Sequence, residues 1–192
     1  MQDRSVLSSI TSADVTDGGG AVERNAGTWH VARVCCNAER TVCRRLVEAG
    51  IEAYVPVIKK RSRRRDRITF IDSILISMYV FFRCGDDRIK SIYRFPGIVD
   101  ILRCAGTTNY AVIPDTQIDS LKILCANAVE SLVFKPGQIR PGTRIVISHG
   151  RLKGVTGEIL STDASCTSLC VRIDLLGCAV VNVPVEWCVG DM

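Results

Sequence analysis

The sequence lacks the residue patterns that most enzyme sites need. Its only histidines are His30 and His149, and it contains neither a G-x-S-x-G nucleophile motif nor a Walker phosphate-binding loop. No pair of carboxylates stands within a recognisable motif, so a catalytic site would have to be assembled from scattered residues. We therefore expect no enzymatic activity and no cofactor.

Long apolar runs are also missing. No uninterrupted apolar stretch approaches the roughly 20 residues that a membrane-spanning helix needs. The N-terminus has Asp3 and Arg4 and then a short, weakly apolar stretch, which does not resemble an export signal. The sequence predicts a cytoplasmic protein that does not enter a membrane.

Cysteine is abundant, but its spacing is not that of a metal site. None of the ten cysteines forms a C-x-x-C pair, and Cys166 with Cys170, the nearest approach to a half-site, has no second half. Most of the cysteines stand among apolar neighbours, as small buried side chains do in a reducing compartment. We expect reduced, buried cysteines and no bound metal.

The net charge of +5 is unevenly distributed. Residues 28–126 carry 17 Lys and Arg against 10 Asp and Glu, whereas residues 141–192 carry 4 against 5. The positive field therefore belongs to the first folded segment. An acidic or polyanionic partner is expected to meet that segment first.

Composition divides the chain into four parts. Residues 1–27 are rich in Ser, Thr, Asp and Gly and predict a flexible tail. Residues 28–126 predict a mixed α/β domain. Residues 127–141 contain one Pro-Gly pair, end at the proline of a second, and have no apolar period, which is typical of a linker. Residues 142–192 hold short alternating segments without a helical pattern, which favours a small β-barrel.

The first domain predicts a split βαβ sheet with one additional helix. Asn37 is a good N-cap for a helix that ends at Gly50, and Asp115 begins a later helix whose apolar stripe includes Leu121. A short helix is expected at residues 89–93. The predicted strands are residues 29–34, 53–58, 78–84 and 98–103.

Residues 144–159 are the clearest hairpin of the barrel. Ile145 and Ile147 alternate with polar residues, and Gly150, Gly154 and Gly157 provide the backbone freedom for a tight reversal and a twisted strand. The glycine spacing and basic turn resemble the KOW motif of transcription and ribosomal proteins. Further strands are predicted at residues 155–160, 169–174, 178–183 and 186–189.

Together these parts resemble the NusG superfamily of transcription elongation factors. The segment IDLLG at residues 173–177 is closer to the specialised UpxY-type, RfaH-like antiterminators, whereas Ser77-Met78 departs from the family's Pro-Gly. The resemblance is carried by residues 29–34 (WHVARV), 37–40 (NAER), 54–56 (YVP), 78–82 (MYVFF), 95–99 (FPGIV) and 111–115 (AVIPD).

The resemblance implies an α+β fold, in which an N-terminal NGN-type split βαβ antiparallel sheet with three helices is linked to a small C-terminal SH3-like KOW β-barrel. It implies a monomer that binds the clamp helices of the largest RNA polymerase subunit. By position, Ile76, Tyr79 and Phe81 are the expected anchors on the apolar strand. The alternative is that helices cover both faces of this strand.

For the basic residues, the resemblance implies contact with non-template or upstream DNA, or with nascent RNA. In the first helix the candidates are Arg40, Thr41, Arg44 and Arg45; the alternative is that these residues serve only solubility. The run at residues 59–67 holds seven cations and no aromatic residue, which favours phosphate contact over base reading; the alternative is a solvated hairpin tip. Its candidates are Lys59, Lys60, Arg63, Arg64, Arg65 and Arg67.

In the barrel, His149, Arg151 and Lys153 form an exposed first turn. The resemblance implies that this barrel binds the ribosomal protein NusE or the terminator Rho. The whole chain is thus expected to suppress pausing and premature termination, for specific polysaccharide-type operons. The alternatives are a general NusG-like factor and a KOW-type RNA-binding or ribosome-associated protein without polymerase contact.

Overall fold

The computed structural model describes residues 27–64, 67–127, 132–136, 142–162, 166–173 and 176–190. The predicted tail, except for Gly27, and the predicted contact residue Arg65 lie outside these ranges, as do the side chains of Arg63, Arg64 and Arg67. In the described part of the chain, no helix is long and apolar enough to cross a membrane.

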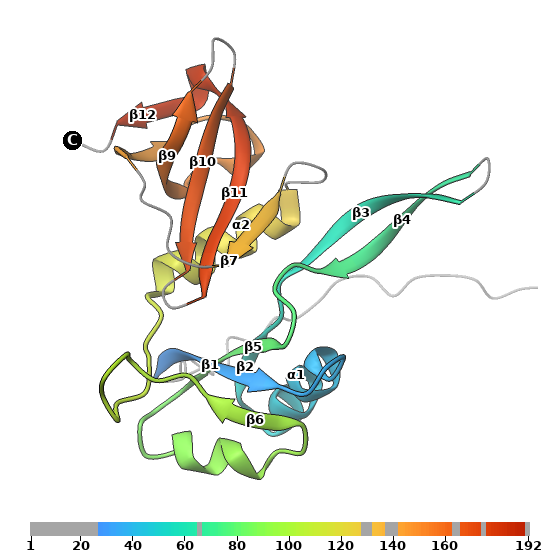
Figure 1. Cartoon of the computed structure of the whole chain (residues 1–192), viewed down its shortest axis with the longest axis vertical. Helices are drawn as coiled ribbons and strands as arrows, with labels where there is room; N and C mark the ends of the chain where they lie inside the picture. Colours follow the sequence, from blue (N-terminus) through green and yellow to red (C-terminus); the bar gives the residue numbers. More distant parts are fainter. Residues whose placement is uncertain are drawn as a thin grey trace, which may run out of the picture.

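The first domain is built on an antiparallel sheet with the strand order β2-β5-β1-β6 (Figure 1). Its strands are β1 (Thr28–Val34), β2 (Glu52–Tyr54), β5 (Tyr79–Cys84) and β6 (Ile98–Ile101). Each neighbouring pair runs antiparallel. This is the sheet that the alternating apolar pattern predicts.

One face of the sheet is covered by helix α1 (Glu39–Glu48) and the 3-10 helix Ile89–Arg94. Val42 and Leu46 of α1 are buried against Val80 and Phe82 of β5. The predicted N-cap is wrong, because the capping position is Ala38, which makes no side-chain cap bond. Asn37 instead takes a left-handed turn with φ +60°, a conformation that asparagine tolerates.

The turn before β5 places Met78 in the left-handed region, with φ +67°. Its backbone N–H donates to Glu39 Oε1 at 2.7 Å, which ties the turn to the first residue of α1. Glu39 is buried, and its Oε2 has no hydrogen-bond partner among the described residues. The bend is thus made with a residue that carries a Cβ, at the position where the resemblance implies Pro-Gly.

We expect Met78→Gly to raise the free energy of unfolding by about 0.5–1 kcal/mol, because the relief of the left-handed backbone exceeds the added chain entropy. The side chain of Met78 is 42% exposed, so its loss removes little packing. Urea denaturation measures the change. Ser77→Gly is the control and should destabilise, since Ser77 has no positive φ. A loss of stability in Met78→Gly would refute this account of the turn.

Strands β3 (Val57–Arg64) and β4 (Arg67–Ile74) form a long hairpin that projects from the body of the molecule (Figure 1). The sequence predicted one strand at residues 53–58 followed by a basic segment. The structure instead ends β2 before Pro56 and extends β3 through the basic run. Proline removes a backbone donor, which explains the break between β2 and β3.

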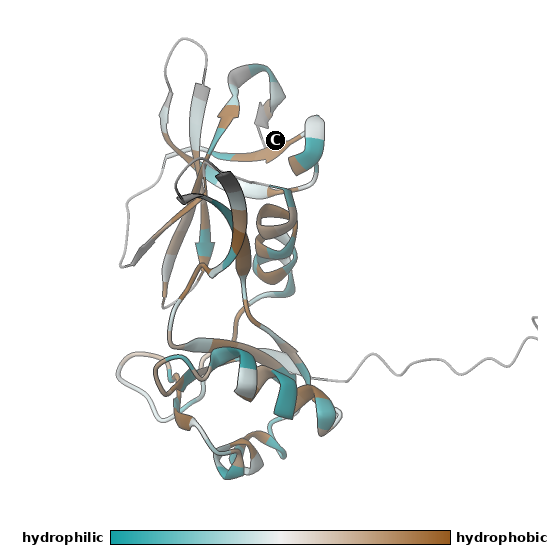
Figure 2. Cartoon of the chain, turned by 90° about the vertical axis from the view of Figure 1, so that its right-hand side faces the viewer, coloured by the Kyte–Doolittle hydropathy of each residue, from teal (hydrophilic) through white to brown (hydrophobic). Residues whose placement is uncertain are grey.

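Helix α2 (Asp115–Asn127) lies between the sheet and the barrel. Of the predicted stripe, Ile118, Leu121 and Leu124 are fully buried, whereas Cys125 is only partly buried. These residues belong to a core that runs from Trp29 and Phe81 of the sheet into the barrel. Apolar segments of α2 face the barrel strands in Figure 2. The two parts of the chain therefore share one hydrophobic core.

Part of the predicted linker forms strand β7 (Val133–Pro136), which pairs antiparallel with β11 (Gly177–Pro184). No alternating apolar pattern marks this segment, because the strand is only four residues long. The sheet of the C-terminal domain has six strands in the order β12-β8-β9-β10-β11-β7. Its other strands are β8 (Arg144–Ile147), β9 (Thr156–Thr162), β10 (Cys166–Ile173) and β12 (Cys188–Gly190). The predicted all-β C-terminal domain is confirmed.

The glycines of the first barrel hairpin have two different roles. Gly150 and Gly154 have positive φ values of +75° and +89°, as a tight reversal requires. Gly157 allows β9 to lie close to β10, because an added Cβ would be 2.7 Å from the Cys170 carbonyl oxygen and from the Leu169 side chain. The glycine pattern therefore fixes both the turn and the strand packing.

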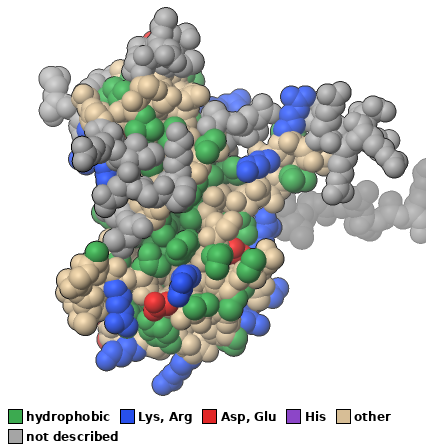
Figure 3. Space-filling view, viewed as in Figure 1, with side chains coloured by type: hydrophobic (Ala, Val, Ile, Leu, Met, Phe, Trp, Pro, Cys, Tyr) green, Lys and Arg blue, Asp and Glu red, His purple; other side chains and the backbone are tan. Residues whose placement is uncertain are grey.

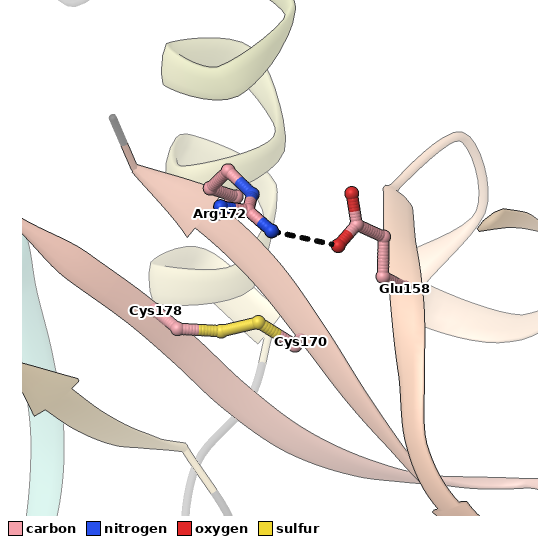
Figure 4. The surroundings of a disulfide bond; sticks show 4 residues. All are labelled: Glu158, Cys170, Arg172 and Cys178. Carbon is pink, nitrogen blue, oxygen red and sulfur yellow. Dashed lines mark hydrogen bonds and ion pairs between the residues drawn. A yellow bond between two sulfur atoms is a disulfide. The ribbon is translucent and has the colours of Figure 1, made fainter. Parts of the chain in front are cut away.

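The cysteines differ from expectation. Cys170 and Cys178 form a disulfide between β10 and β11, close to the Arg172–Glu158 ion pair (Figure 4). The other exceptions are the exposed thiols of Cys35, Cys36 and Cys104. Cys170 and Cys178 are buried as predicted, but the prediction that they are reduced is wrong. The prediction of burial is wrong for Cys35, Cys36 and Cys104, because apolar neighbours in sequence do not decide which strand face or turn a residue occupies.

Candidate functional site

The sheet face that meets α2 is strongly aromatic. Tyr54, Phe81 and Val31 are cross-strand partners, and Trp29 lies two residues before Val31 on the same face. The rings of Tyr54 and Phe81 are 6.3 Å apart and tilted. This face corresponds to the apolar patch that the sequence predicts for a protein partner.

Charged residues fasten α2 to this face. Lys122 Nζ lies 4.9 Å from the Trp29 ring centroid and 5.8 Å from that of Tyr54, and pairs with Glu52 at 3.6 Å. Arg83 pairs with Glu52 at 3.6 Å and with Asp115 at the start of α2. The cation–π and ionic contacts together hold the helix over the aromatic rings.

Burial changes the chemistry of the contact between Tyr54 and α2. The pKa of Tyr54 is raised, first by burial and then by Cys125, with which the hydroxyl forms a hydrogen bond. Burial also raises the pKa of Cys125. Both groups therefore stay neutral at physiological pH.

The three predicted anchors occupy different environments. Ile76 and Phe81 are only 2% and 0% exposed, whereas Tyr79 is partly exposed. The strand is covered on both faces in this arrangement, as the alternative interpretation held. Ile76 and Phe81 can contact a partner only if the segments over them move aside.

An apolar groove opens beside these anchors, between the root of the β3–β4 hairpin and strand β7. Its volume is about 490 Å³. Figure 3 shows apolar side chains gathered in the centre of this face of the molecule. The sequence did not reveal the groove, because its far wall lies in the predicted linker. It is lined by Ile58, Lys60, Arg61, Leu75, Leu132, Val133 and Phe134.

The basic residues of α1 are on the surface. Arg44 pairs with Glu48 at 3.7 Å, and Arg45 donates to the Pro96 carbonyl oxygen at 2.9 Å. Arg40 donates to the Asp72 carbonyl oxygen in β4 at 3.5 Å, so it lies at the root of the hairpin. Thr41 is partly exposed. The structure thus brings Arg40 close to the basic hairpin.

The described hairpin cations Lys59, Lys60 and Arg61 are all exposed. The sequence run contains no aromatic residue, but its partner strand does: Phe70 lies directly opposite Arg61. The sequence analysis missed this neighbour because it considered residues 59–67 without the strand that pairs with them. The register of residues 57–74 was the signal that could have found it.

In the barrel, His149, Arg151 and Lys153 are exposed around the 3-10 helix Gly150–Leu152. Ser148 Oγ and His149 Nδ1 are 2.6 Å apart. Within the ranges that the structure describes, no group of three or more His, Cys, Asp or Glu residues is arranged to hold a metal ion.

Residues 27–122 match the family model described as "Transcription termination factor nusG". The solved structure titled "Domain interaction in Thermotoga maritima NusG" is similar over 86% of this chain and 98% of that chain, with 15% identity and a TM-score of 0.45. A structure of the MjSpt4:Spt5 complex covers 85% of this chain and 99% of its own, with 13% identity and a TM-score of 0.29. A comparison with curated proteins finds no match.

Proposed function

The chain belongs to the NusG family of transcription factors, and we propose that it binds the coiled-coil clamp helices of the largest RNA polymerase subunit through its apolar groove. Members of this family act by binding rather than by catalysis, in agreement with the expectation that the chain is not an enzyme. On the polymerase, it suppresses pausing and premature termination by stabilising one clamp conformation. Such a factor works in the cytoplasm.

The observation that carries this proposal is the position of the groove. Ile58 and Leu75 line it and belong to the same apolar core as Ile76, Tyr79 and Phe81. A helix that docks there first meets the partly exposed Leu75, which directly precedes Ile76 in the sequence, and Tyr79 is also partly exposed. Large apolar side chains in a half-open groove are the usual anchors of a helical partner.

Binding to the deeper anchors competes with α2 and the barrel for the same face. The affinity of a partner for Phe81 is lowered by the fraction of molecules in which this face is covered. Tyr79 and the groove residue Leu75 are less subject to this competition, since both are already partly exposed. Docking therefore begins at the groove and extends to Ile76 and Phe81 when the covering segments move.

A transcription assay with purified polymerase tests the proposal. The wild-type chain should shorten the dwell time at a defined pause, and Leu75→Asp should abolish the effect by placing a charge in the groove. Val99→Asp is the matched control, because Val99 is an exposed valine on β6, outside the groove. Equal activity of the wild-type chain and Leu75→Asp, with both folded, would contradict the proposal.

The basic residues supply a second contact in this proposal, with single-stranded non-template DNA, upstream DNA or nascent RNA. Arg40, Arg44 and Arg45 are exposed on α1, and Arg40 reaches the root of the basic hairpin. Each cation that neutralises a phosphate releases counterions, so this contact is expected to weaken with salt.

Specificity for polysaccharide-type operons, as in UpxY factors, is supported by the segment at residues 173–177. The position of the gene tests it: the head of a long polysaccharide operon supports an operon-specific factor, and a solitary place beside ribosomal genes supports a general one. The exposed barrel residues His149, Arg151 and Lys153 are proposed to bind NusE or Rho, which pull-downs with each protein would distinguish.

A further inference from the structure

The β3–β4 hairpin exposes two consecutive large apolar side chains. Phe70 is 54% exposed and Ile71 is 50% exposed. The hairpin projects from the molecule, so the body of the protein does not cover its outer part (Figure 1). Among the described residues, the ring of Phe70 takes part in none of the ring–ring or cation–ring contacts. Its ring is therefore available to a partner.

The strand register places two cations on the same face of the hairpin as Phe70. Phe70 is directly opposite Arg61, and Asp72 is directly opposite Lys59. Directly opposed residues share a face, and residues two apart on a strand are about 6.6–6.8 Å apart. Ile71 pairs with Lys60 and points to the opposite face. Phe70 thus has Arg61 beside it and Lys59 one step along the same face.

We propose that this face is a stacking site for a base of single-stranded nucleic acid, with Phe70 as the stacking ring and Lys59 and Arg61 as the phosphate contacts. The inference rests on the nucleic-acid contact in the proposed function and names its ligand class and its recognition residue. An aromatic ring beside cations binds bases of any sequence, because every base has a π-face. A duplex hides its base faces within the stack, so Phe70 selects single strands.

Charge favours a polyanion over an acidic protein surface here. Lys59, Lys60 and Arg61 are exposed on consecutive positions of β3. Lys59 and Arg61 share the face of Phe70, and their spacing along the strand is comparable with that of neighbouring phosphates in a stretched single strand. Asp72 is the acid that faces Lys59. Its carbonyl oxygen accepts a hydrogen bond from Arg40, which brings a further cation to the end of this face.

Fluorescence anisotropy with the full-length chain tests the inference on a labelled single-stranded oligonucleotide and on the duplex of the same sequence. Phe70→Ala should weaken single-strand binding about five- to tenfold and leave duplex binding unchanged. The slope of log affinity against log salt concentration should be the same for Phe70→Ala as for the wild type. Arg61→Ala should reduce this slope by about one, the value expected for the loss of one phosphate contact. Ile71→Ala is the matched control and should bind like the wild type.

Phe70→Trp gives a direct optical signal. It should keep single-strand affinity, and its fluorescence should be quenched by the single strand beyond any change in the wild type, which has Trp29 and Trp187. Wild-type affinity in Phe70→Ala would overturn the inference and leave the general nucleic-acid contact intact. No binding by the wild type would overturn both. A pause defect in Phe70→Ala with unchanged single-strand affinity would assign Phe70 to a protein contact instead.

Discussion

Gly150→Ala is expected to lower the free energy of unfolding by about 2–5 kcal/mol. Gly150 has φ +75°, where a residue with a Cβ is strained by about 1–2 kcal/mol. An added Cβ would also lie 2.4 Å from two carbons of the Trp187 ring, and such overpacking costs about 1–3 kcal/mol. Thermal and urea denaturation, followed by circular dichroism, measure the loss.

Gly154→Ala is the matched control for this substitution. Gly154 has φ +89° in the same turn, but nothing lies within 4 Å of the Cβ position. It should therefore show the backbone cost alone, about 1–2 kcal/mol. Equal losses in the two variants would show that Trp187 does not pack over Gly150.

Leu121→Ala is expected to cost about 2–5 kcal/mol, since it removes a fully buried side chain from the shared core. Helix α2 contacts both parts of the molecule: Lys122 lies over Trp29, and the Thr156 backbone N–H donates to Ser120 Oγ at 3.5 Å. The sheet and the barrel should therefore lose stability together. The loss of stability in the two parts is measured by urea unfolding, followed by the fluorescence of Trp29 and Trp187.

Val47→Ala serves as the control for Leu121→Ala, because Val47 is an exposed apolar residue on α1. Its effect should stay within about 0.5 kcal/mol. A small effect of Leu121→Ala, or a loss confined to one part of the chain, would show that α2 does not join the two parts in solution.

Much of the fold could be predicted from local patterns. Alternation predicts the central strands, and the spacing of Ile118, Leu121 and Leu124 predicts α2. Gly150 and Gly154 mark the barrel turn, where the backbone does adopt positive φ. These features depend on neighbours in sequence, which is why the sequence alone suffices.

The candidate site depends on tertiary contacts and was harder to predict. The burial of Phe81 follows from the way α2 and the barrel pack, and the groove needs Leu132 and Phe134 from a segment that reads as a linker. Phe70 was missed because its importance comes from its cross-strand partner, Arg61. In each case the missing information is which distant segment lies alongside.

The central claim is most directly tested by the dissociation constant of the full-length chain for the isolated clamp-helix fragment of polymerase, measured by calorimetry. We predict binding by the wild type, at least tenfold weaker binding by Leu75→Asp and by Tyr79→Ala, and unchanged binding by Val99→Asp. Melting curves establish that each variant is folded. Absence of binding by the wild type, or wild-type affinity in folded Leu75→Asp, would contradict the account.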